Sequence, residues 1–515
     1  MKKLALVLVI LMVAITLVTT GCNREPAQLT VEIFDRGTDG GRSVANDNAW
    51  TKWVQEKVKA DLNIDVTFVS VGRWQETDLI VNLMAAGDAP DLCYTYAGGM
   101  IATFRDQGGV MNLAPYIDRY LPDLKKLLGD DPAFPGKDFI YRNADPQTGE
   151  IYSIPSYRVA LAQRNVFIRK DWLDKLGLPV PSTPEQFYAA LVAFRDNAET
   201  LGVSRIVPYG QNNDVRWGLA NPIHHFINEN LNDRDRWINT VHDRYIMMPG
   251  YKEGVREMNK WYNDRLIYQD FPIMTTADDF YNQIKSGVVG AFCQNWDLPY
   301  RQDYKILEEL QANVPGANYV PVDVFKNKDM FDKVGLQMFI PKTAEAKGTH
   351  IAALRYLNWL AKPENFGFLQ IGQEGVNHVL VNGIPNIQGR PAGDEWFQNS
   401  AQNIDMTMPM NGVELGSTEM NARVLALGYG SIPSEVIVEA YATSVRGARA
   451  AAVYQATTTV NQYEAVLQQK AGDLLAQAIR ARPADFDRIW DEGIADWLSS
   501  GGQEVINERS SLYPR

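Results

Sequence analysis

Cysteine and histidine, the residues that most often bind metals or act as nucleophiles, are scarce: the 515 residues include three cysteines and five histidines. The histidines are scattered, and none stands at zinc-ligand spacing with a cysteine. His225 and Glu229 are four residues apart, but such a pair is more often a solvated surface pair than a metal site. The sequence therefore predicts no metal site and no resident cofactor.

Motifs of the common enzyme classes are absent as well. There is no phosphate-binding loop and no GxGxxG, GxSxG or HExxH pattern. A glycosidase needs only two carboxylates that face each other across a sugar, and among 62 Asp and Glu residues such a pair leaves no sequence signature. We therefore expect a protein that is not an enzyme, with a lipid-anchored polysaccharide-active enzyme as the alternative.

Positive charge is in deficit, because 50 Lys and Arg residues stand against 62 Asp and Glu, for a formal net charge of -12. No basic patch stands out to meet phosphates, which disfavours nucleic acid as a partner. After residue 18 no segment is apolar enough to cross a membrane. The chain after residue 28 is too long for one hydrophobic core, so we expect two lobes.

The one long apolar run, residues 4–18, follows a short positive start at Lys2 and Lys3 and carries no charge. It is short for a permanent membrane span, and its basic start is typical of an export signal. The run ends before Gly21 and Cys22, in a segment that resembles the lipobox cut by the lipoprotein signal peptidase. That motif usually has Leu or a similar residue where Thr19 stands, and a plain secretory signal is the alternative.

Lipid attachment at Cys22 would place the protein outside the cytoplasm. Cleavage would remove a signal peptide at residues 1–21 and leave residues 22–28 as a lipidated tether. We expect the mature protein on the outer face of the cytoplasmic membrane or in the periplasm, held to the membrane by this lipid only. Cys93 and Cys293 each lie inside an apolar segment and are expected as buried free thiols rather than as a disulfide.

Strands alternate with helices along the chain, which is typical of an α/β fold. A helix start at 183–186 combines an N-cap threonine, a proline and a glutamine that completes a capping box. Apolar stripes at 351–360 and 486–497 predict helices that pack into a core. Further strands are predicted at 29–34, 65–71, 91–96, 151–155 and 165–168, and further helices at 49–62, 75–86 and 170–176.

Five short segments carry motifs that occur in the same order in one known family. Residues 87–92, Gly-Asp-Ala-Pro-Asp-Leu, are similar to a Gly-Asp-x-Pro-Asp-(Ile/Leu) signature, and residues 151–155 to a Lys-x-Tyr-x-x-Pro strand. Residues 167–187 resemble the segment in which that family's chain enters its second lobe. Residues 286–296 look like Gly-x-x-Gly-Ala-Met…Trp, and residues 373–385 are similar to the long oligosaccharide-binding branch. On these motifs the chain resembles family 1 extracellular solute-binding proteins over nearly its whole length.

The resemblance implies an α/β, two-lobed periplasmic-binding-protein-like fold with a hinge and an interlobe ligand cleft. Such a protein binds a small molecule, here expected to be an oligosaccharide, and delivers it as a monomer to the membrane permease of an ABC importer. The chain is expected to cross between lobes near 156–165, 314–320 and 341–346. The expected N-terminal lobe is 29–163 plus 319–344, and the C-terminal lobe is 164–318 plus 345–515.

Candidate ligand contacts are polar and aromatic residues just beyond strand ends that face the expected cleft. Sugars suit such residues, because their C–H faces stack on aromatic rings and their hydroxyls pair with carboxylates, amides and arginine. For each candidate except Trp296, capping, surface pairing or core packing is an equal alternative. The candidates are Asp35, Arg36, Tyr96, Tyr157 and Arg158 from the first lobe, and Trp217, Trp296 and Glu374 from the second.

Trp296 is the foremost of these candidates. It follows a strand predicted at 288–292, in which Gly287 and Gly290 permit close backbone approach, and it stands in a polar loop without an obvious core to join. The resemblance implies that a tryptophan at this place lies in the sugar site. A ring that covers the lobe's own surface is the alternative.

Two segments depart from the resembled family. Some oligosaccharide-binding relatives carry a calcium loop after the helix that here is 187–194, but residues 195–200 offer too few spaced oxygen ligands. Residues 386–434 follow no pattern that predicts a structure. A peptide remains the alternative ligand, and a surface adhesion or scaffolding lipoprotein remains the alternative to an importer component.

Overall fold

The described part of the chain lies between residues 25 and 512. The computed structural model describes residues 25–36, 44–132, 134, 136–145, 147–240, 245–301, 304–376, 378–386, 404–411, 415, 417–426, 429, 432–450 and 458–512. The expected signal peptide and Cys22 lie outside these residues. Within them, no helix is both long and apolar enough to span a bilayer.

The first lobe is built on a mixed sheet in the order β2-β1-β3-β10-β4-β13, in which an isolated parallel bridge between Val31 and Leu92 joins β1 to β3. β1 is parallel to β2, and β10 is antiparallel to both β3 and β4. It follows that β1, β2, β3 and β4 all run in one direction, so their carboxyl ends share one edge. The strands are β1 (Ala27–Asp35), β2 (Ile64–Gly72), β3 (Cys93–Thr95), β4 (Ile154–Arg158), β10 (Val334–Phe339) and β13 (Met410–Asn411).

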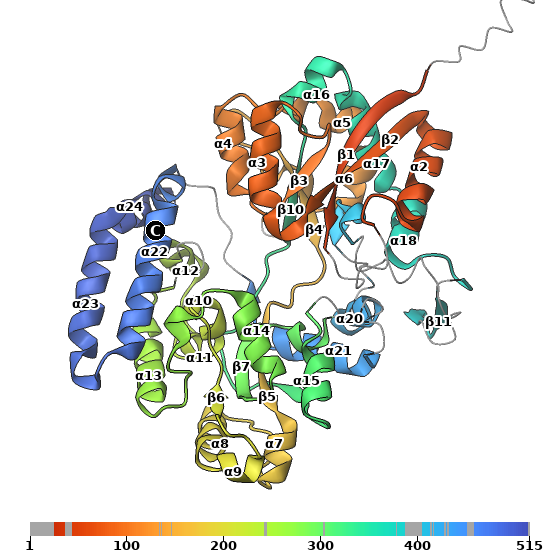
Figure 1. The fold of residues 1–515 in the computed structure, drawn as a ribbon. Coiled ribbons are helices and arrows are strands. Elements are labelled where there is room, and N and C mark those ends of the chain that lie inside the picture. Colours follow the sequence, from red (N-terminus) through yellow and green to blue (C-terminus); the bar gives the residue numbers. More distant parts are fainter. Residues whose placement is uncertain are drawn as a thin grey trace, which may run out of the picture.

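Helices cover this sheet and complete the upper half of the molecule (Figure 1). The helix predicted at 49–62 is confirmed: Asn48 caps its start in a capping box with Thr51, and Asn63 ends it in the left-handed conformation. The helices are α2 (Ala49–Leu62), α3 (Glu76–Ala86), α4 (Gly99–Asp106), α5 (Ile117–Tyr120), α6 (Pro122–Leu128), α16 (Lys342–Lys347), α17 (His350–Leu360) and α18 (Pro363–Ile371). A hairpin of β11 (Val379–Val381) and β12 (Ile384–Asn386) follows α18.

The second lobe has a four-stranded sheet in the order β6-β7-β5-β8. β5 is antiparallel to β7 and β8, whereas β6 is parallel to β7. The strands are β5 (Arg164–Arg169), β6 (Val207–Tyr209), β7 (Val289–Asn295) and β8 (Tyr319–Val322). The helices between these strands are α7 (Lys170–Lys175), α8 (Pro184–Asp196), α9 (Ala198–Leu201), α10 (Val215–Gly218), α11 (Ala220–His224), α12 (Asp233–Asn239), α13 (Tyr251–Asn263), α14 (Ala277–Lys285) and α15 (Ile306–Asn313).

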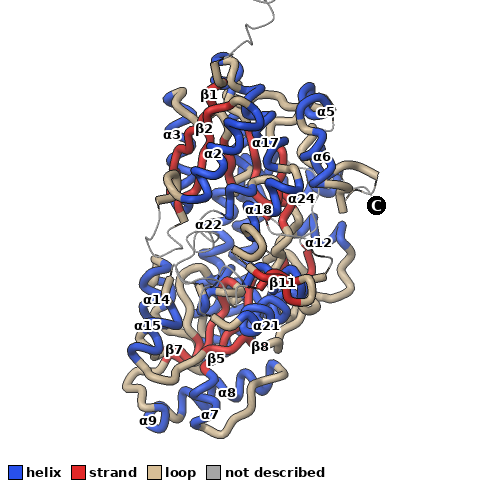
Figure 2. Tube along the Cα trace, turned by 90° about the vertical axis from the view of Figure 1, so that its right-hand side faces the viewer, coloured by secondary structure: helices blue, strands red, loops and turns tan. Residues whose placement is uncertain are grey.

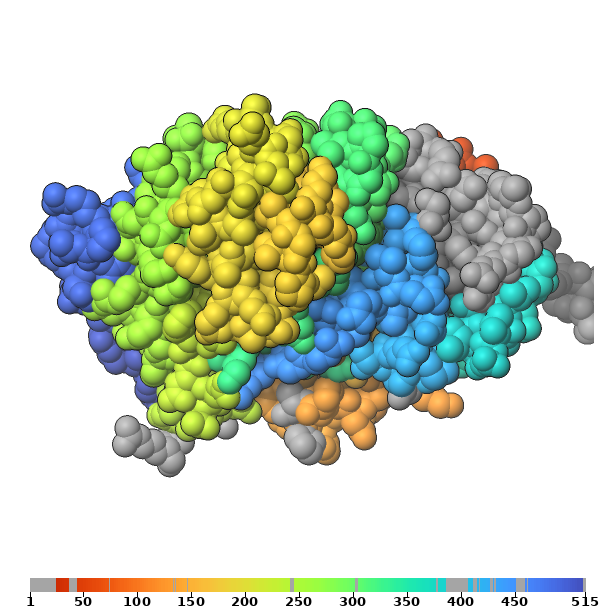
Figure 3. All heavy atoms as spheres, turned by 90° about the horizontal axis from the view of Figure 1, so that it is seen from below, coloured from red at the N-terminus to blue at the C-terminus, as the bar shows by residue number. Residues whose placement is uncertain are grey.

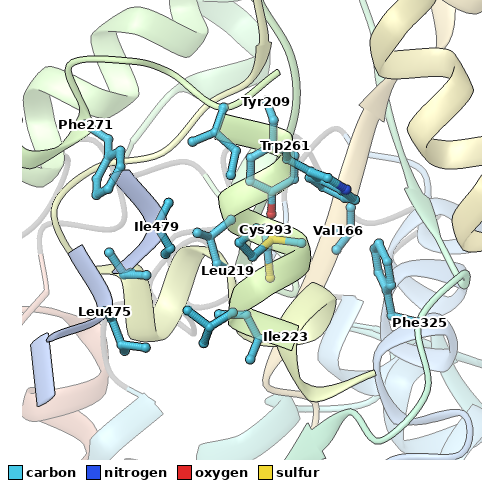
Figure 4. Packing of buried hydrophobic residues seen from close by; sticks show 14 of the residues in the cluster. Val166, Tyr209, Leu219, Ile223, Trp261, Phe271, Cys293, Phe325, Leu475 and Ile479 are labelled. Atoms are coloured by element: carbon cyan, nitrogen blue, oxygen red, sulfur yellow. The ribbon is translucent and has the colours of Figure 1, made fainter. Parts of the chain in front are cut away.

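Helices from the C-terminal part of the chain also pack onto the second lobe. They are α20 (Thr418–Ala426), α21 (Ser434–Val445), α22 (Thr458–Arg480), α23 (Phe486–Trp497) and α24 (Gln503–Leu512). Seen from below, the blue residues of α20 and α21 lie on the surface next to the yellow and green parts of the chain (Figure 3). Leu475 and Ile479 of α22 join Val166, Tyr209 and Trp261 in one buried apolar cluster (Figure 4). The end of the chain is therefore part of the second lobe's core.

Close backbone packing explains Gly290 in β7. A Cβ atom at this position would lie 2.8 Å from the carbonyl oxygen of Pro208 and 2.7 Å from the Phe194 side chain. The predicted close approach at this glycine is confirmed. The predicted helix start at 183–186 is confirmed in part: Thr183 caps α8, but the Gln186 side chain accepts from the backbone of Ser182 and does not close a capping box on Thr183.

The two sheets are joined by crossings of the chain (Figures 1 and 2). The first crossing links the end of β4 to the start of β5, within the expected 156–165. The second runs from the end of β8 to the start of β10, whereas 314–320 was expected, because β8 still pairs with β5. Within it, β9 (Asp329–Met330) pairs with β14 (Arg449–Ala450). The third crossing was expected at 341–346, but β13 still pairs with β4 in the first lobe, and the next described helix, α20, packs in the second lobe.

Helices α16 to α18 belong to the first lobe, although residues from 345 onward were expected in the second. The apolar stripe predicted at 351–360 is confirmed as a core face, but Leu354, Leu357 and Leu360 pack in the cluster that contains Val31 and Met338. This cluster fills the first lobe around β1 and β10. The chain therefore returns to the second lobe only after β13.

The two cysteines in the described residues are free and buried, as expected. Cys93 lies in β3 of the first sheet and Cys293 in β7 of the second, so the two thiols belong to different lobes. Burial raises the pKa of the Cys293 thiol to about 11, which keeps it protonated and unreactive near neutral pH.

Candidate ligand-binding site

The carboxyl ends of the four parallel strands of the first lobe face the second lobe. β4 ends at Arg158, where the first crossing leaves, and β10 starts at Val334, where the second crossing arrives. Ligands of α/β proteins bind outside the carboxyl ends of parallel strands, because the loops there converge from neighbouring strands. The residues that follow β1, β2, β3 and β4 are therefore the candidate site of the first lobe.

Three arginines from three of these strand ends surround the ring of Tyr96, which directly follows β3. The guanidinium carbon lies 4.3 Å from the ring centre for Arg73, 5.8 Å for Arg158 and 6.0 Å for Arg36. A guanidinium nitrogen of Arg36 also donates to the Tyr96 hydroxyl at 3.4 Å. We call these four residues the Tyr96 cluster. Cation–π attraction to one ring stabilises an arrangement in which three positive charges would otherwise repel one another.

Buried contacts hold the Tyr96 cluster in position. The carboxylate of Glu76, at the start of α3, accepts from the backbone N–H of Tyr96 and from the hydroxyl of Thr95, both at 3.0 Å. Its other oxygen lies 3.3 Å from Arg73. Phe34 stacks on Tyr96 with ring centres 6.2 Å apart. The ring that organises the arginines is thus fixed by β1, β3 and α3 together.

Arg158 differs from its neighbours because it also reaches the second crossing. Its guanidinium lies 4.3 Å from the ring centre of Phe331. Burial lowers the pKa of Arg158, the charges of Arg36 and Arg73 lower it further, and Asp332 acts in the opposite direction. The Arg158 side chain therefore carries a charge that the surrounding protein compensates only in part.

The facing edge of the second lobe carries Trp217 at the carboxyl side of β6. Trp217 is half-buried in α10, and the guanidinium of Arg164, the first residue of β5, lies 4.6 Å from its ring centre. Arg164, the first residue of β5, pairs with Asn295, the last residue of the antiparallel strand β7. Because β6 is parallel to β7, the loops after both strands lie at this same edge. Trp217 is thus the half-exposed aromatic candidate on the second lobe.

A buried ion pair lies where the crossings meet the second lobe. Arg164 lies 2.6 Å from Asp329 of β9, and Nδ1 of His224 lies 3.0 Å from the same carboxylate oxygen. Burial alone would raise the pKa of Asp329, but His224 and Arg164 outweigh it and lower this pKa to about 2. The pair joins the end of the first crossing to the second crossing, so removal of either partner would leave the other charge buried at the hinge.

Trp296 lies in a different environment from the one the sequence predicts. The ring is only 7% exposed and belongs to an apolar cluster of the second lobe, where it meets Tyr441 edge-on with ring centres 5.3 Å apart. The loop therefore does offer a core to join, because α21 supplies one from a distant part of the sequence. Ligand contact by Trp296 stays a prediction.

Of the three remaining candidates, one lies at the edge of the first sheet that faces the second lobe, and two do not. Asp35 ends β1 and lies exposed at the same edge as Arg36. Side chains alternate along a strand, so Tyr157 points to the face opposite Arg158, where it packs on Phe139 with ring centres 5.1 Å apart. Glu374 is exposed in the turn before the β11–β12 hairpin and does not end a strand of either central sheet.

Three residues at this site were missed by the sequence analysis. Arg164 was missed because it starts β5, whereas the candidates were chosen from residues that follow strands. Arg73 follows β2 as directly as Arg36 follows β1, so the rule that selected Arg36 would also have found it. Phe331 lies in the second crossing, whose position the sequence did not reveal. Among the described residues, no group of three or more His, Cys, Asp or Glu side chains could hold a metal ion. In the segment expected to lack a calcium loop, Arg195 pairs with Asp196.

Two lobes joined by crossings of the chain, with candidate residues on facing sheet edges, are the arrangement expected of a solute-binding protein. The chain belongs to the family of bacterial extracellular solute-binding proteins, which matches residues 41–365. Polygalacturonan/rhamnogalacturonan-binding protein YtcQ of Bacillus subtilis (strain 168) is 22% identical over 470 residues, covering 87% of this chain and 85% of that protein. Lipoprotein LipO of the same strain is 27% identical over 248 residues, covering 44% of this chain and 43% of LipO.

Solved structures share the fold over almost the whole chain. Alginate-binding protein AlgQ2 without calcium ion is 18% identical, with a TM-score of 0.62, and covers 96% of this chain and 100% of its own. The EF-hand mutant of the S. pneumoniae ABC-transporter substrate-binding protein FusA, in complex with fructo-nystose, has a TM-score of 0.65 at 15% identity, covering 94% and 98%. These matches show the two-lobed fold.

The ion pair at the hinge predicts a pH-dependent stability. Asp329→Asn should lower the free energy of unfolding by about 3 kcal/mol at pH 7, because it leaves Arg164 buried without its carboxylate. The pKa of Asp329 is lower in the folded state than in the unfolded state, so its ion pair stabilises the protein fully above the unfolded pKa near 4. This stabilisation is lost as the pH falls toward 2. Urea unfolding should therefore show a smaller difference between the two proteins at pH 3 than at pH 7.

Asp487→Asn is the matched control for this prediction. The pKa of Asp487 is also lowered to about 2, by Arg256 and Lys252, but this carboxylate is solvent-exposed. We expect a smaller loss of stability there, because water screens exposed pairs. Equal losses for the two variants would show that the Asp329 pair contributes no more than a surface pair.

Proposed function

We propose that this protein is the extracytoplasmic solute-binding component of a bacterial ABC importer and that it binds an oligosaccharide between its lobes. The observation that carries the proposal is the pair of facing sheet edges, with the Tyr96 cluster on one and Trp217 with Arg164 on the other. Family membership supports binding and transport. YtcQ and the fructooligosaccharide-binding FusA of Streptococcus pneumoniae support a saccharide as the ligand.

The chemistry at both edges suits a sugar. A half-exposed indole such as Trp217 gives a flat apolar face on which the C–H groups of a pyranose ring can stack. Guanidinium groups present several N–H donors in a fixed fork, which pair well with the oxygens of a sugar. Contacts from both lobes would be made together only when the lobes approach, so the ligand would select a closed form.

Binding without conversion is the activity we propose. The closed protein would hand its sugar to a membrane permease, act as a monomer, and take no part in nucleic-acid binding. A carbohydrate-active enzyme of this fold would need two opposed carboxylates about 5 to 10 Å apart. The described residues that converge on the Tyr96 cluster are mainly arginines, which bind oxygen ligands and do not transfer protons at neutral pH.

The proposed function predicts saturable binding of an oligosaccharide. In a thermal-shift screen, an oligosaccharide at about 100 times its Kd should stabilise the protein by about 2.7 kcal/mol, whereas peptides should not. Trp217→Ala should then weaken binding about tenfold in calorimetry, because an aromatic platform contributes roughly 1–2 kcal/mol. Trp217→Phe, which keeps a flat ring, should retain most of the affinity.

Three results would contradict the proposed function in different ways. Stabilisation by peptides alone would assign a different ligand. Appearance of shorter sugars on incubation with the purified protein would indicate an enzyme. An unchanged melting temperature with every saccharide and peptide would favour an adhesion or scaffolding role.

We also propose that a lipid on Cys22 anchors the protein. The basic start, the apolar run and the small residue before Cys22 support an export signal with a lipobox, and the family is extracellular. Cys22→Ser should abolish incorporation of labelled palmitate and release the protein from the membrane fraction, since serine cannot form the thioether. Cys93→Ser, at a buried thiol, is the control and should leave labelling unchanged. Palmitate that still enters the Cys22→Ser variant would contradict the anchor.

A further inference from the structure

The geometry points to an acidic oligosaccharide as the ligand, bound through its carboxylate or sulfate groups by the Tyr96 cluster. This inference rests on the proposed function and adds the charge of the sugar to it. It depends on the convergence of Arg36, Arg73 and Arg158 and, above all, on the environment of Arg158.

The first observation is where the three arginines come from. Arg36 follows β1, Arg73 follows β2 and Arg158 ends β4, so three separate chain segments bring a guanidinium to one aromatic ring. Each of these strands ends at the edge that faces the second lobe. Glu76 offsets the charge of Arg73 in part, but three guanidiniums around one ring still favour a bound anion over none.

The second observation concerns Arg158. Within the described part of the chain its guanidinium has cation–π contacts to Phe331 and Tyr96, but it makes no hydrogen bond or ion pair, and its Nε is closed off from solvent. The nearby carboxylate of Asp332 instead accepts from the backbone N–H of Val334 at 3.2 Å and lies 3.6 Å from Arg142. A partly buried guanidinium without a carboxylate partner is costly, and an anionic ligand group would compensate it.

The third observation is the contrast with Arg164 on the facing edge. Arg164 also lies over an aromatic ring, but Asp329 neutralises it at 2.6 Å. The second lobe therefore presents an aromatic ring beside a compensated charge, which suits the uncharged face of a sugar. In the first lobe Glu76 lies 3.3 Å from Arg73, but Arg158 has no carboxylate partner of this kind among the described residues, and its planar fork matches carboxylate and sulfate oxygens.

The overall charge of the protein is negative, so the Tyr96 cluster stands against the general charge of the chain. The chain carries a formal net charge of -12, which by itself would repel an anion at long range. At physiological salt such long-range repulsion is screened beyond about 8 Å, whereas contacts inside the site are not. Recognition of an acidic sugar would therefore come from the Tyr96 cluster and not from general attraction to the protein surface.

The test compares acidic oligosaccharides with their neutral derivatives on the unmodified protein. Calorimetry would use oligouronates against their methyl esters, and sulfated oligosaccharides against their desulfated forms. We expect at least one acidic form to bind ten or more times more tightly than its neutral partner, as is typical of a desolvated charge pair. Its affinity should fall as salt rises, while that of the neutral form should stay nearly constant.

Substitution of Arg158 assigns this preference to the Tyr96 cluster. Arg158→Met keeps an unbranched side chain but removes the guanidinium that lies over Phe331. It should weaken the acidic ligand about tenfold or more, while the neutral form changes by less than about twofold. Arg205→Met, at a side chain that is 65% exposed in the second lobe, is the control and should leave both affinities unchanged.

The possible outcomes separate this inference from the proposed function. Neutral forms that bind as tightly as the acidic ones would overturn the inference and leave the proposed function standing. An acidic preference that survives Arg158→Met in a protein that melts normally would also overturn it. Failure of every saccharide to bind would overturn the proposed function itself. If Arg158→Met does not fold, the comparison of acidic and neutral ligands on the unmodified protein still decides whether the ligand is acidic.

Discussion

The direction of four strands in the first lobe determines where everything else in the site lies. β1, β2, β3 and β4 are parallel, so the residues that follow them meet at one edge, and the crossings to the second lobe leave from the same edge. This constraint brings Arg36, Arg73, Tyr96 and Arg158 together, although they are spread over more than a hundred residues of sequence. Without the shared direction, the three guanidiniums would not surround one ring.

The hinge extends this arrangement to the second lobe. The first two crossings are hydrogen-bonded to each other, from the N–H of Arg158 to the carbonyl of Lys333 at 2.6 Å and from the N–H of Phe331 to the carbonyl of Leu161 at 2.9 Å. Arg158 contacts Phe331 within these paired crossings, and the Arg164–Asp329 pair connects them to the second lobe. A ligand group that binds Arg158 would therefore act at the point where the two lobes can move relative to each other.

Much of the fold could be predicted from the sequence, because strand and helix signals are local. The helix at 49–62, the first strand and the free cysteines are confirmed, and the family motifs gave the two-lobed fold. The second and third crossings could not be placed, because α17 has an apolar face that suits either lobe, and only tertiary packing shows that it fills the first.

The site was predictable to the extent that it depends on strand ends. That rule selected Arg36, Tyr96 and Arg158, which the structure brings together, and it would have selected Arg73. The rule could not predict that Trp296 is buried. Tyr441, the ring that packs against it, lies far along the chain, and only the folded lobe brings the two rings into contact. Tyr157 shows the same limit, since its neighbour Arg158 shares the strand but faces the other way.

The central claim is that a ligand between the two lobes draws them together. Small-angle X-ray scattering of the purified protein, with and without a saturating oligosaccharide identified by calorimetry, tests this most directly. The account predicts that the radius of gyration falls on saturation, because contacts to the Tyr96 cluster and to Trp217 can be made together only when the lobes approach. A radius of gyration that stays unchanged while calorimetry shows full occupancy would contradict a hinged, closing site.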